Sequence, residues 1–186
     1  MIIDKAFLEQ NTVVAAKQLL GCHLIRKTAK GVIRIEITET EAYRGSDDPA
    51  SHASRAVTPR NRLMFGDVGQ VYVYLIYGMH LCMNIVAHEA DGVGAILLRA
   101  GKPLEGIDLI RANRLNTADR QLMNGPGKLA RALEVDLSFN GYDLLQSGEL
   151  SLYLEYHKPS ASSIVRATPR IGISKGIDLP WRFVMD

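Results

Sequence analysis

Residues 32–43, VIRIEITETEAY, contain the pattern that decides the fold. Apolar and polar side chains alternate along this stretch, which is typical of a β-strand with one buried face. The isoleucines from Ile33 to Ile37 share that face. Counting on by twos places Glu39, Glu41 and Tyr43 on the same face. We therefore expect a long strand that carries two carboxylates and an aromatic ring towards its end.

Strand patterns and helix patterns are mixed along the rest of the chain, without strict alternation. This mixture favours an α+β fold built on an antiparallel sheet. With 186 residues, 47% of them apolar, and with neither repeats nor linker composition, residues 1–186 are expected to form a single domain. We expect a helix capped by Thr12 and ended by Gly21, strands at 22–27, 71–76, 81–87 and 93–100, helices at 104–115 and from Gly125, and short strands at 150–156 and 163–173.

The composition limits the classes of protein that remain open. The 22 basic and 20 acidic side chains nearly balance, so the chain lacks the strong positive charge of a non-specific nucleic-acid binder. A balanced total still permits a basic face that binds DNA. Cys22 and Cys82 lie far apart, which argues against a disulfide scaffold and against a zinc site. The absence of a membrane-spanning stretch or a signal-peptide core predicts a soluble, intracellular protein.

Glu41 is the first candidate for chemistry. A carboxylate at the end of an apolar strand face is partly removed from water, which makes it a better general base. An alternative is that Glu39 and Glu41 mark the point where the strand reaches solvent. On one strand face their Cβ atoms would be roughly 7 Å apart, a spacing that suits an inverting glycosidase. A sugar hydrolase therefore remains open.

Residues 71–78, VYVYLIYG, hold three of the seven tyrosines. Tyr72 is expected in the core, whereas Gly78 places Tyr77 at the tip of a tight hairpin. An exposed aromatic ring at a hairpin tip suits insertion between stacked bases, although it is also compatible with an ordinary strand residue. Residues 125–128, GPGK, are predicted to begin a helix and leave free N–H groups pointing outward. Such groups attract phosphate, although the segment is also compatible with an ordinary helix start.

The connection from residue 44 to residue 69 is long for a compact domain, and loops of this length are usually functional or disordered. All the candidate catalytic residues considered up to this point lie between Lys30 and Lys102, a stretch without a lysine. A Schiff-base mechanism needs a lysine or a terminal amine as nucleophile. Water is therefore a better candidate for the nucleophile than an amine of the protein.

Nine short blocks occur in order along nearly the whole chain. They are ETEAY (39–43), SH (51–52), TPRNR (58–62), YVYLIYGM (72–79), CMNI (82–85), LLRA (97–100), PLEG (103–106), GPGKL (125–129) and RIG (170–172). Together they resemble the alkyladenine (3-methyladenine) DNA glycosylase family, in a compact bacterial-type form without a long N-terminal extension.

The resemblance implies a single domain with a curved antiparallel sheet, surrounding helices and a protruding hairpin. It implies a cytoplasmic monomer without metal or cofactor, acting on double-stranded DNA. Such an enzyme flips 3-methyladenine, 7-methylguanine, ethenoadenine or hypoxanthine out of the duplex and hydrolyses its bond to the sugar, leaving an abasic site.

Residue roles follow from the same resemblance. Glu41 would activate water, and Arg99 and the Ile171 carbonyl would help to hold it. Tyr43 and His52 would stack on the flipped base, and Tyr74 would lie at its edge. Asn84 would exclude the guanine amino group. The base pocket would consist of Tyr43, His52, Tyr74, Asn84 and Ile171, and the DNA contacts would come from Tyr77, Met79, Thr58, Arg60, Gly127 and Lys128.

Three features depart from the vertebrate pattern of that family. The loop from His52 to Thr58 is one residue shorter, His80 replaces a tyrosine, and Gly127 replaces a serine. Two other classes of function stay open: a non-catalytic binder of damaged or single-stranded nucleic acid, and a hydrolase of free nucleosides or small glycosides that uses Glu39 and Glu41.

Overall fold

A computed structural model describes residues 1–146, 148–149 and 151–186. Its helices are α1 (Lys5–Leu8), α2 (Thr12–Gln18), α3 (Ile107–Asn113) and α4 (Pro126–Ala132), with short 3₁₀ turns at Arg62–Phe65, Asp119–Gln121 and Leu137–Phe139. Its strands are β1 (His23–Thr28), β2 (Gly31–Arg44), β3 (Val71–Ile76), β4 (His80–Val86), β5 (Gly94–Glu105), β6 (Leu152–Glu155), β7 (Val165–Thr168) and β8 (Arg182–Met185).

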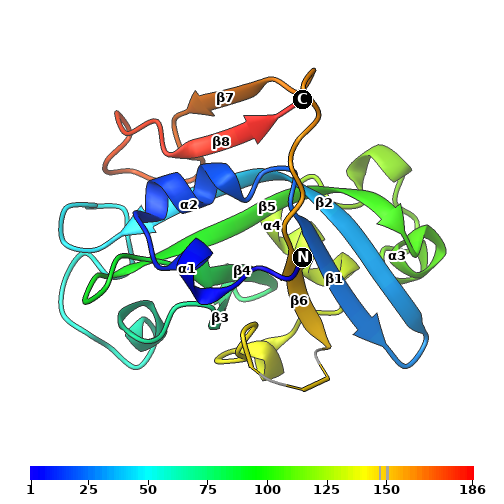
Figure 1. Ribbon diagram of the computed structural model, residues 1–186, viewed down its shortest axis with the longest axis horizontal. Helices are drawn as coiled ribbons and strands as arrows, with labels where there is room; N and C mark the ends of the chain where they lie inside the picture. The colour runs from blue at the N-terminus through cyan, green and yellow to red at the C-terminus, as the bar shows by residue number, and fades with distance from the viewer. Residues whose placement is uncertain (147, 150) are drawn as a thin grey trace.

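The eight strands form one antiparallel sheet. Six of them follow the order β3-β4-β5-β2-β1-β6, while β8 pairs with β2 and with β7 (Figure 1). β2 is the central element, because it pairs with β1, β5 and β8. The predicted α+β fold with a curled antiparallel sheet, surrounding helices and a β3–β4 hairpin is confirmed.

Two clusters of buried apolar side chains hold the elements together. The main core lies where α2 packs on β2 and β5 and where α4 packs on β4 and β5. A minor cluster lies beneath the connection from β2 to β3 and consists of Ala53, Met64, Tyr72, Val86 and Ala95. Tyr43 and Tyr74 pack against the minor cluster, so the long connection covers a second, aromatic face of the sheet.

The face of β2 that packs in the main core changes partway along the strand. From Ile33 to Ile37 the odd-numbered side chains lie in the main core, as predicted. Pairing with β5 then shifts on either side of Glu39. Beyond the shift, the even-numbered residues occupy the core side: Thr40 donates its hydroxyl to the Ala16 carbonyl of α2, and Ala42 joins the main core.

The register shift corrects the prediction from simple alternation. A β-bulge adds a residue to one strand and re-aims the side chains that follow it. Glu41 and Tyr43 therefore point away from the isoleucine face, towards the aromatic side of the sheet. The expectation that the isoleucines, Glu39, Glu41 and Tyr43 share one face is wrong.

Several boundaries of helices and strands in the structure also differ from the predicted ones. The cap of α2 is Asn11, whose side chain accepts from Val13 and Val14, whereas Thr12 is the first helical residue and bonds the Ala87 carbonyl. The predicted strand from residue 93 continues to Glu105, because it stays paired with β2.

Consequently α3 spans only Ile107–Asn113 instead of 104–115, after Gly106 in the left-handed region. The last predicted strand is also shorter, since β7 ends at Thr168 and leaves Ile171 in irregular structure. The predicted start of β6 at Leu150 lies outside the described residues. β8 was not predicted. Within the described part of the chain, no helix has the length and apolar content needed to cross a membrane.

Thr40 gives a test of this packing. Replacing Thr40 with Val keeps its shape but leaves the Ala16 carbonyl without its side-chain donor. We expect a loss of about 1–3 kcal/mol in the free energy of unfolding, measured by urea denaturation. The control Thr117→Val, at an exposed hydroxyl contact, should change stability by less than about 0.5 kcal/mol. Equal midpoints for the two variants would contradict the role given to Thr40.

Candidate active site

The Glu41 carboxylate is fully buried and receives three hydrogen bonds. Its Oε2 accepts from the Tyr43 hydroxyl at 2.8 Å and from Arg99 Nη1 at 3.3 Å. Its Oε1 accepts from the backbone N–H of Ile171 at 2.8 Å. A buried carboxylate without partners is very costly, so these donors replace the water that the group has lost. Sequence reasoning predicted neither the Tyr43 hydroxyl nor the Ile171 amide as a partner of Glu41.

Tyr43 is held in its donating form. Burial and the neighbouring Glu41 carboxylate both raise the pKa of the Tyr43 phenol above its usual range. The hydroxyl therefore stays protonated at physiological pH and donates to the carboxylate. Tyr43 thus combines an aromatic face with a polar contact to the candidate base.

Arg99 is fixed by a second carboxylate. Its Nε donates to Glu39 Oε1 at 2.7 Å, and Arg182 Nε donates to the same oxygen at 2.6 Å. Burial opposes the charge on Arg99, but Glu41 and Glu39 together outweigh it and raise the pKa of the guanidinium. Because two arginines engage Glu39, it is poorly suited to act as the acid of a two-carboxylate sugar hydrolase. Glu39 instead orients Arg99 towards Glu41.

An aromatic pocket adjoins Tyr43. It encloses about 20 Å³, and its lining is Tyr43, Ala50, His52, Met64, Tyr72, Tyr74 and Asn84. The structure therefore brings together four of the five residues predicted for the base pocket. The fifth, Ile171, meets Glu41 through its backbone and has a half-exposed side chain outside this pocket. The volume is enough for about one water molecule, so a purine fits only if the rings separate.

His52 is positioned by residues that sequence reasoning did not select. Its Nδ1 lies 3.0 Å from the Tyr72 hydroxyl, and Asn61 Nδ2 donates to its backbone carbonyl at 2.8 Å. The ring meets Tyr74 edge-on, with centroids 4.7 Å apart. Burial, followed by the charge of Arg60, lowers the pKa of His52, which favours the neutral imidazole. Tyr72 had been assigned to the core alone, and it is buried, yet its hydroxyl faces the pocket.

The β3–β4 hairpin presents Tyr77 to solvent. Tyr77 and Gly78 have φ angles of 52° and 69°, so both central turn residues are left-handed, as in type I′ turns. The Tyr77 side chain is 81% exposed and that of Met79 is 71% exposed. The expected exposed aromatic tip is therefore present.

A wide groove of about 1310 Å³ runs between this hairpin and α4. Its lining includes Tyr77, Met79, Arg99, Lys128 and Ile171. The groove thus joins the two hairpin residues to two of the residues that bond Glu41. Lys128 also contacts Asn124, through an Nζ–Oδ1 bond of 2.7 Å.

His80 and Gly127 lie side by side in the structure. A Cβ atom on Gly127 would lie 3.0 Å from the His80 Cβ. His80 at the start of β4 therefore packs against the bare backbone of α4, and a larger residue at position 127 would have to displace it. His80 and Gly127, which sequence reasoning treated separately, therefore pack against each other.

Thr58 and Arg60 lie elsewhere. Both belong to the connection from β2 to β3, where the Thr58 amide donates to Asn61 and the Arg60 guanidinium lies 5.2 Å from the Tyr74 ring centroid. Arg60 therefore lies beside a ring that lines the aromatic pocket, whereas Met79, Gly127 and Lys128 line the wide groove. Among the described residues, no group of three or more His, Cys, Asp or Glu side chains is arranged to hold a metal ion.

Comparison with known proteins extends these observations. A family model described as Methylpurine-DNA glycosylase (MPG) matches residues 6–186. A protein of Prosthecochloris aestuarii is 48% identical over 181 residues, which cover 97% of this chain and 86% of its own length. One of Carboxydothermus hydrogenoformans is 42% identical over 185 residues (100% and 95%), and one of Rubrobacter xylanophilus is 49% identical over 168 residues (90% and 85%). Each of the three is named "Putative 3-methyladenine DNA glycosylase".

These matches extend over nearly the whole chain, and they confirm the resemblance carried by its motifs. The family consists of DNA glycosylases, which hydrolyse the N-glycosidic bond between a base and its sugar. The buried carboxylate and the aromatic pocket are therefore the features to examine for that reaction. The chain is a hydrolase of the DNA glycosylase type and belongs to the Methylpurine-DNA glycosylase family.

Proposed function

We propose that the chain is a monofunctional glycosylase that flips alkylated or deaminated purines out of duplex DNA and hydrolyses their N-glycosidic bond with water activated by Glu41. The candidate substrates are 3-methyladenine, 7-methylguanine, ethenoadenine and hypoxanthine, and the product is an abasic site. One observation carries this proposal: Glu41 lies between the aromatic pocket and the wide groove. It bonds Tyr43, which lines the pocket, and Arg99 and Ile171, which line the groove.

The groove and the hairpin suit a duplex. Flipping a base costs a few kcal/mol of stacking and pairing, and damaged bases cost least. Insertion of the exposed Tyr77 ring into the vacated space offsets part of that cost. Contacts from Met79, Gly127 and Lys128 in the groove, with Thr58 and Arg60 from the connection between β2 and β3, would hold the DNA backbone. We expect residues 1–186 to act as one domain and as a monomer.

The pocket chemistry suits damaged purines. Stacking on Tyr43 and His52, with Tyr74 at the edge, accepts several purines because every base has an aromatic face. A neutral His52 does not repel the positive charge of an alkylated purine. Asn84 is buried and tied to the Tyr72 carbonyl at 3.0 Å, so it cannot easily yield to the amino group of normal guanine. Admission of a purine requires the pocket to widen beyond its present 20 Å³.

The three donors to Glu41 leave one acceptor position for the nucleophile. Among the described residues, Oε1 accepts one hydrogen bond, and a carboxylate oxygen can accept two. A water bonded there transfers a proton to Glu41 as its oxygen attacks the sugar carbon and the bond to the base breaks. The negative carboxylate also stabilises the developing oxocarbenium charge. An alkylated purine leaves as a neutral base, whereas a neutral lesion must first gain a proton.

Glu41→Gln should slow catalysis strongly without abolishing binding. We expect single-turnover release of hypoxanthine or ethenoadenine from duplex DNA to fall by about 10²–10⁴-fold, because the amide cannot accept the proton. Binding of the same duplex should change by less than about threefold. Glu36→Gln on the same strand is the matched control and should react at the parent rate. Normal turnover by Glu41→Gln would remove this residue from the chemistry.

Tyr77→Ala should weaken recognition of lesion and abasic duplexes. Loss of one stacking contact is worth about 1–3 kcal/mol, so we expect a roughly 5–150-fold rise in Kd, measured by fluorescence anisotropy. Tyr156→Ala, at a half-exposed ring after β6, is the control and should leave Kd unchanged. Unaltered affinity, together with a footprint that shows no contact at the hairpin, would remove the wedge role.

A panel of duplexes, each carrying one defined lesion, tests the whole proposal. Free purine and alkali-sensitive abasic sites are expected from at least one duplex. Retention of lesion DNA without any released base would identify a non-catalytic binder. Turnover of free nucleosides without DNA would identify a nucleoside hydrolase.

A further inference from the structure

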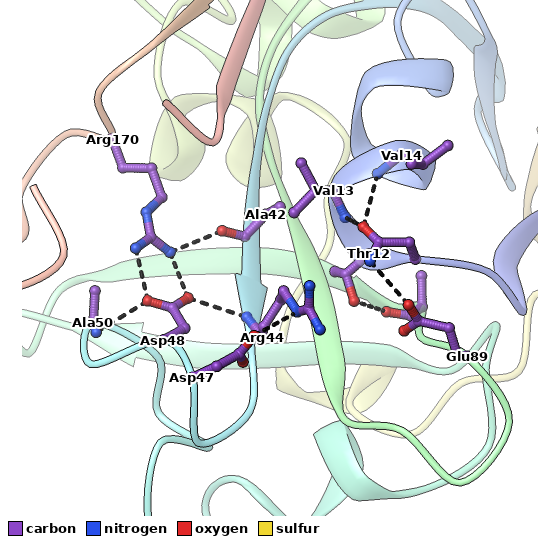
Figure 2. A network of polar contacts seen from close by, with 12 residues as sticks. Thr12, Val13, Val14, Ala42, Arg44, Asp47, Asp48, Ala50, Glu89 and Arg170 are labelled. Atoms are coloured by element: carbon purple, nitrogen blue, oxygen red, sulfur yellow. Dashed lines mark hydrogen bonds and ion pairs between the residues drawn. The ribbon is translucent and has the colours of Figure 1, made fainter. Parts of the chain in front are cut away.

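A buried ion pair lies behind the Glu41 site and takes no part in the chemistry proposed above. Arg170 Nη1 donates to Asp48 Oδ2 at 2.6 Å, and Nη2 donates to Oδ1 at 2.7 Å, which makes a bidentate pair. Both side chains are completely buried. Figure 2 shows the pair and its neighbours. Such a fork is geometrically specific, because both N–H groups must meet both oxygens in one plane.

The pair fixes the end of β2 and the start of the connection that carries His52. Arg170 Nη1 also donates to the Ala42 carbonyl at 2.8 Å. Asp48 accepts from the backbone N–H groups of Arg44 and Ala50, each at 3.1 Å (Figure 2). One aspartate and one arginine thus join residues 42–50, at the end of β2 and the start of the connection, to the distant segment after β7.

Arg170 reaches both oxygens of Glu41 through its neighbours. The residue that follows it, Ile171, donates its N–H to Oε1. The Arg170 guanidinium carbon lies 4.6 Å from the ring centroid of Tyr43, whose hydroxyl donates to Oε2. The position of Arg170 therefore sets two of the three donors to the candidate base.

Little else fixes the Ile171 amide. Among the described residues, no backbone–backbone hydrogen bond holds the stretch 169–175, which follows the end of β7. Gly172 in this stretch is left-handed, with φ of 77°. Because the local backbone lacks such bonds, the side chain of Arg170 is the anchor that keeps the amide aimed at Glu41.

We propose that Arg170 and Asp48 are positioning residues for hydrolysis of the N-glycosidic bond, which hold the Ile171 amide and the Tyr43 ring so that Glu41 keeps its orientation. The pair does not touch the substrate. This inference rests on the proposed glycosylase function and on Glu41 as its base. A small misplacement of a catalytic group is enough to lower the rate of the chemical step about a hundredfold.

Arg170→Lys and Asp48→Asn test the inference. Lysine keeps the charge but loses the bidentate fork and the flat contact with Tyr43. We expect single-turnover release of hypoxanthine to slow by about 10–100-fold for both variants, while the Kd for the same duplex stays within threefold. Arg166→Lys makes the same substitution in an exposed Arg–Asp pair, Arg166–Asp186, and is the matched control, with an expected rate equal to that of the parent chain. Equal rates for Arg170→Lys, Asp48→Asn and Arg166→Lys would overturn the inference.

Amide hydrogen exchange tests the same point without activity. Exchange of the Ile171 amide should accelerate at least tenfold in Arg170→Lys and in Asp48→Asn, and in Glu41→Gln to a smaller extent. Leu154→Ala, in the main core, controls for lost stability and should lower Tm without changing the Ile171 exchange rate under native conditions. Unchanged exchange in the two pair variants would refute the anchor.

The single-turnover rates and the amide exchange rates together distinguish failure of the proposed glycosylase function from failure of the positioning role. If the parent chain releases no purine from any lesion duplex, the proposed function fails, and the exchange data still decide whether the pair anchors Ile171. If the parent chain is active and the pair variants match it in rate, only the positioning role fails. A fall in duplex binding equal to the fall in rate would assign Arg170 and Asp48 to general folding and would also overturn the inference.

Discussion

A carboxylate buried inside the protein constrains the whole architecture. Glu41 is fully buried, and its partners Tyr43, Arg99 and Ile171 come from β2, from β5 and from the segment after β7. A buried charge is tolerated only where hydrogen-bond donors surround it, so these three parts of the chain must meet at one point. The antiparallel pairing of β2 with both β5 and β8 brings them there. The site is therefore a consequence of sheet topology rather than of one contiguous motif.

The bulge in β2 allows one strand to place Ile37 in the core and Glu41 on the opposite face. One strand has to supply core side chains at one end and a buried, hydrogen-bonded carboxylate at the other. Without the register shift at Glu39, the alternation that buries Ile37 would direct Glu41 into the apolar core under α2. The shift turns the second half of the strand over, so that Thr40 and Ala42 fill the core while Glu41 meets polar partners on the opposite face.

Sequence patterns predicted the sheet better than they predicted the contacts. The strands around 32–43 and 71–76 were identified because alternation and β-branched or aromatic residues are local properties. The face of Glu41 was missed because a bulge leaves no mark in the alternation. The start of α3 was misplaced because the pairing of residues up to Glu105 with β2 outweighs their local helical pattern.

Part of the pocket in the candidate site was predicted, but the residues that hold its side chains in place were not, because their roles depend on contacts distant in sequence. Four residues of the aromatic pocket followed from the family motifs, and they do line one cavity. The roles of Glu39, Asn61 and Tyr72 depend on partners that lie 9 to 143 positions away, so no local pattern reveals them. The Asp48–Arg170 pair spans 122 positions and is invisible for the same reason. Sequence motifs identify the candidates for chemistry more readily than the side chains that hold those candidates in place.

The late position of β8 has a consequence for synthesis. The strand at Arg182–Met185 pairs with β2 next to Glu41, and the Ile171 amide comes from the segment just before it. At about 5–20 residues per second, a ribosome needs on the order of ten seconds to proceed from position 41 to position 185. Until the last part of that interval, the Ile171 donor and the β8 partner of β2 have not been synthesised. A nascent chain therefore lacks the complete set of Glu41 donors until almost all of it has been made, and fragments from interrupted translation lack that set as well.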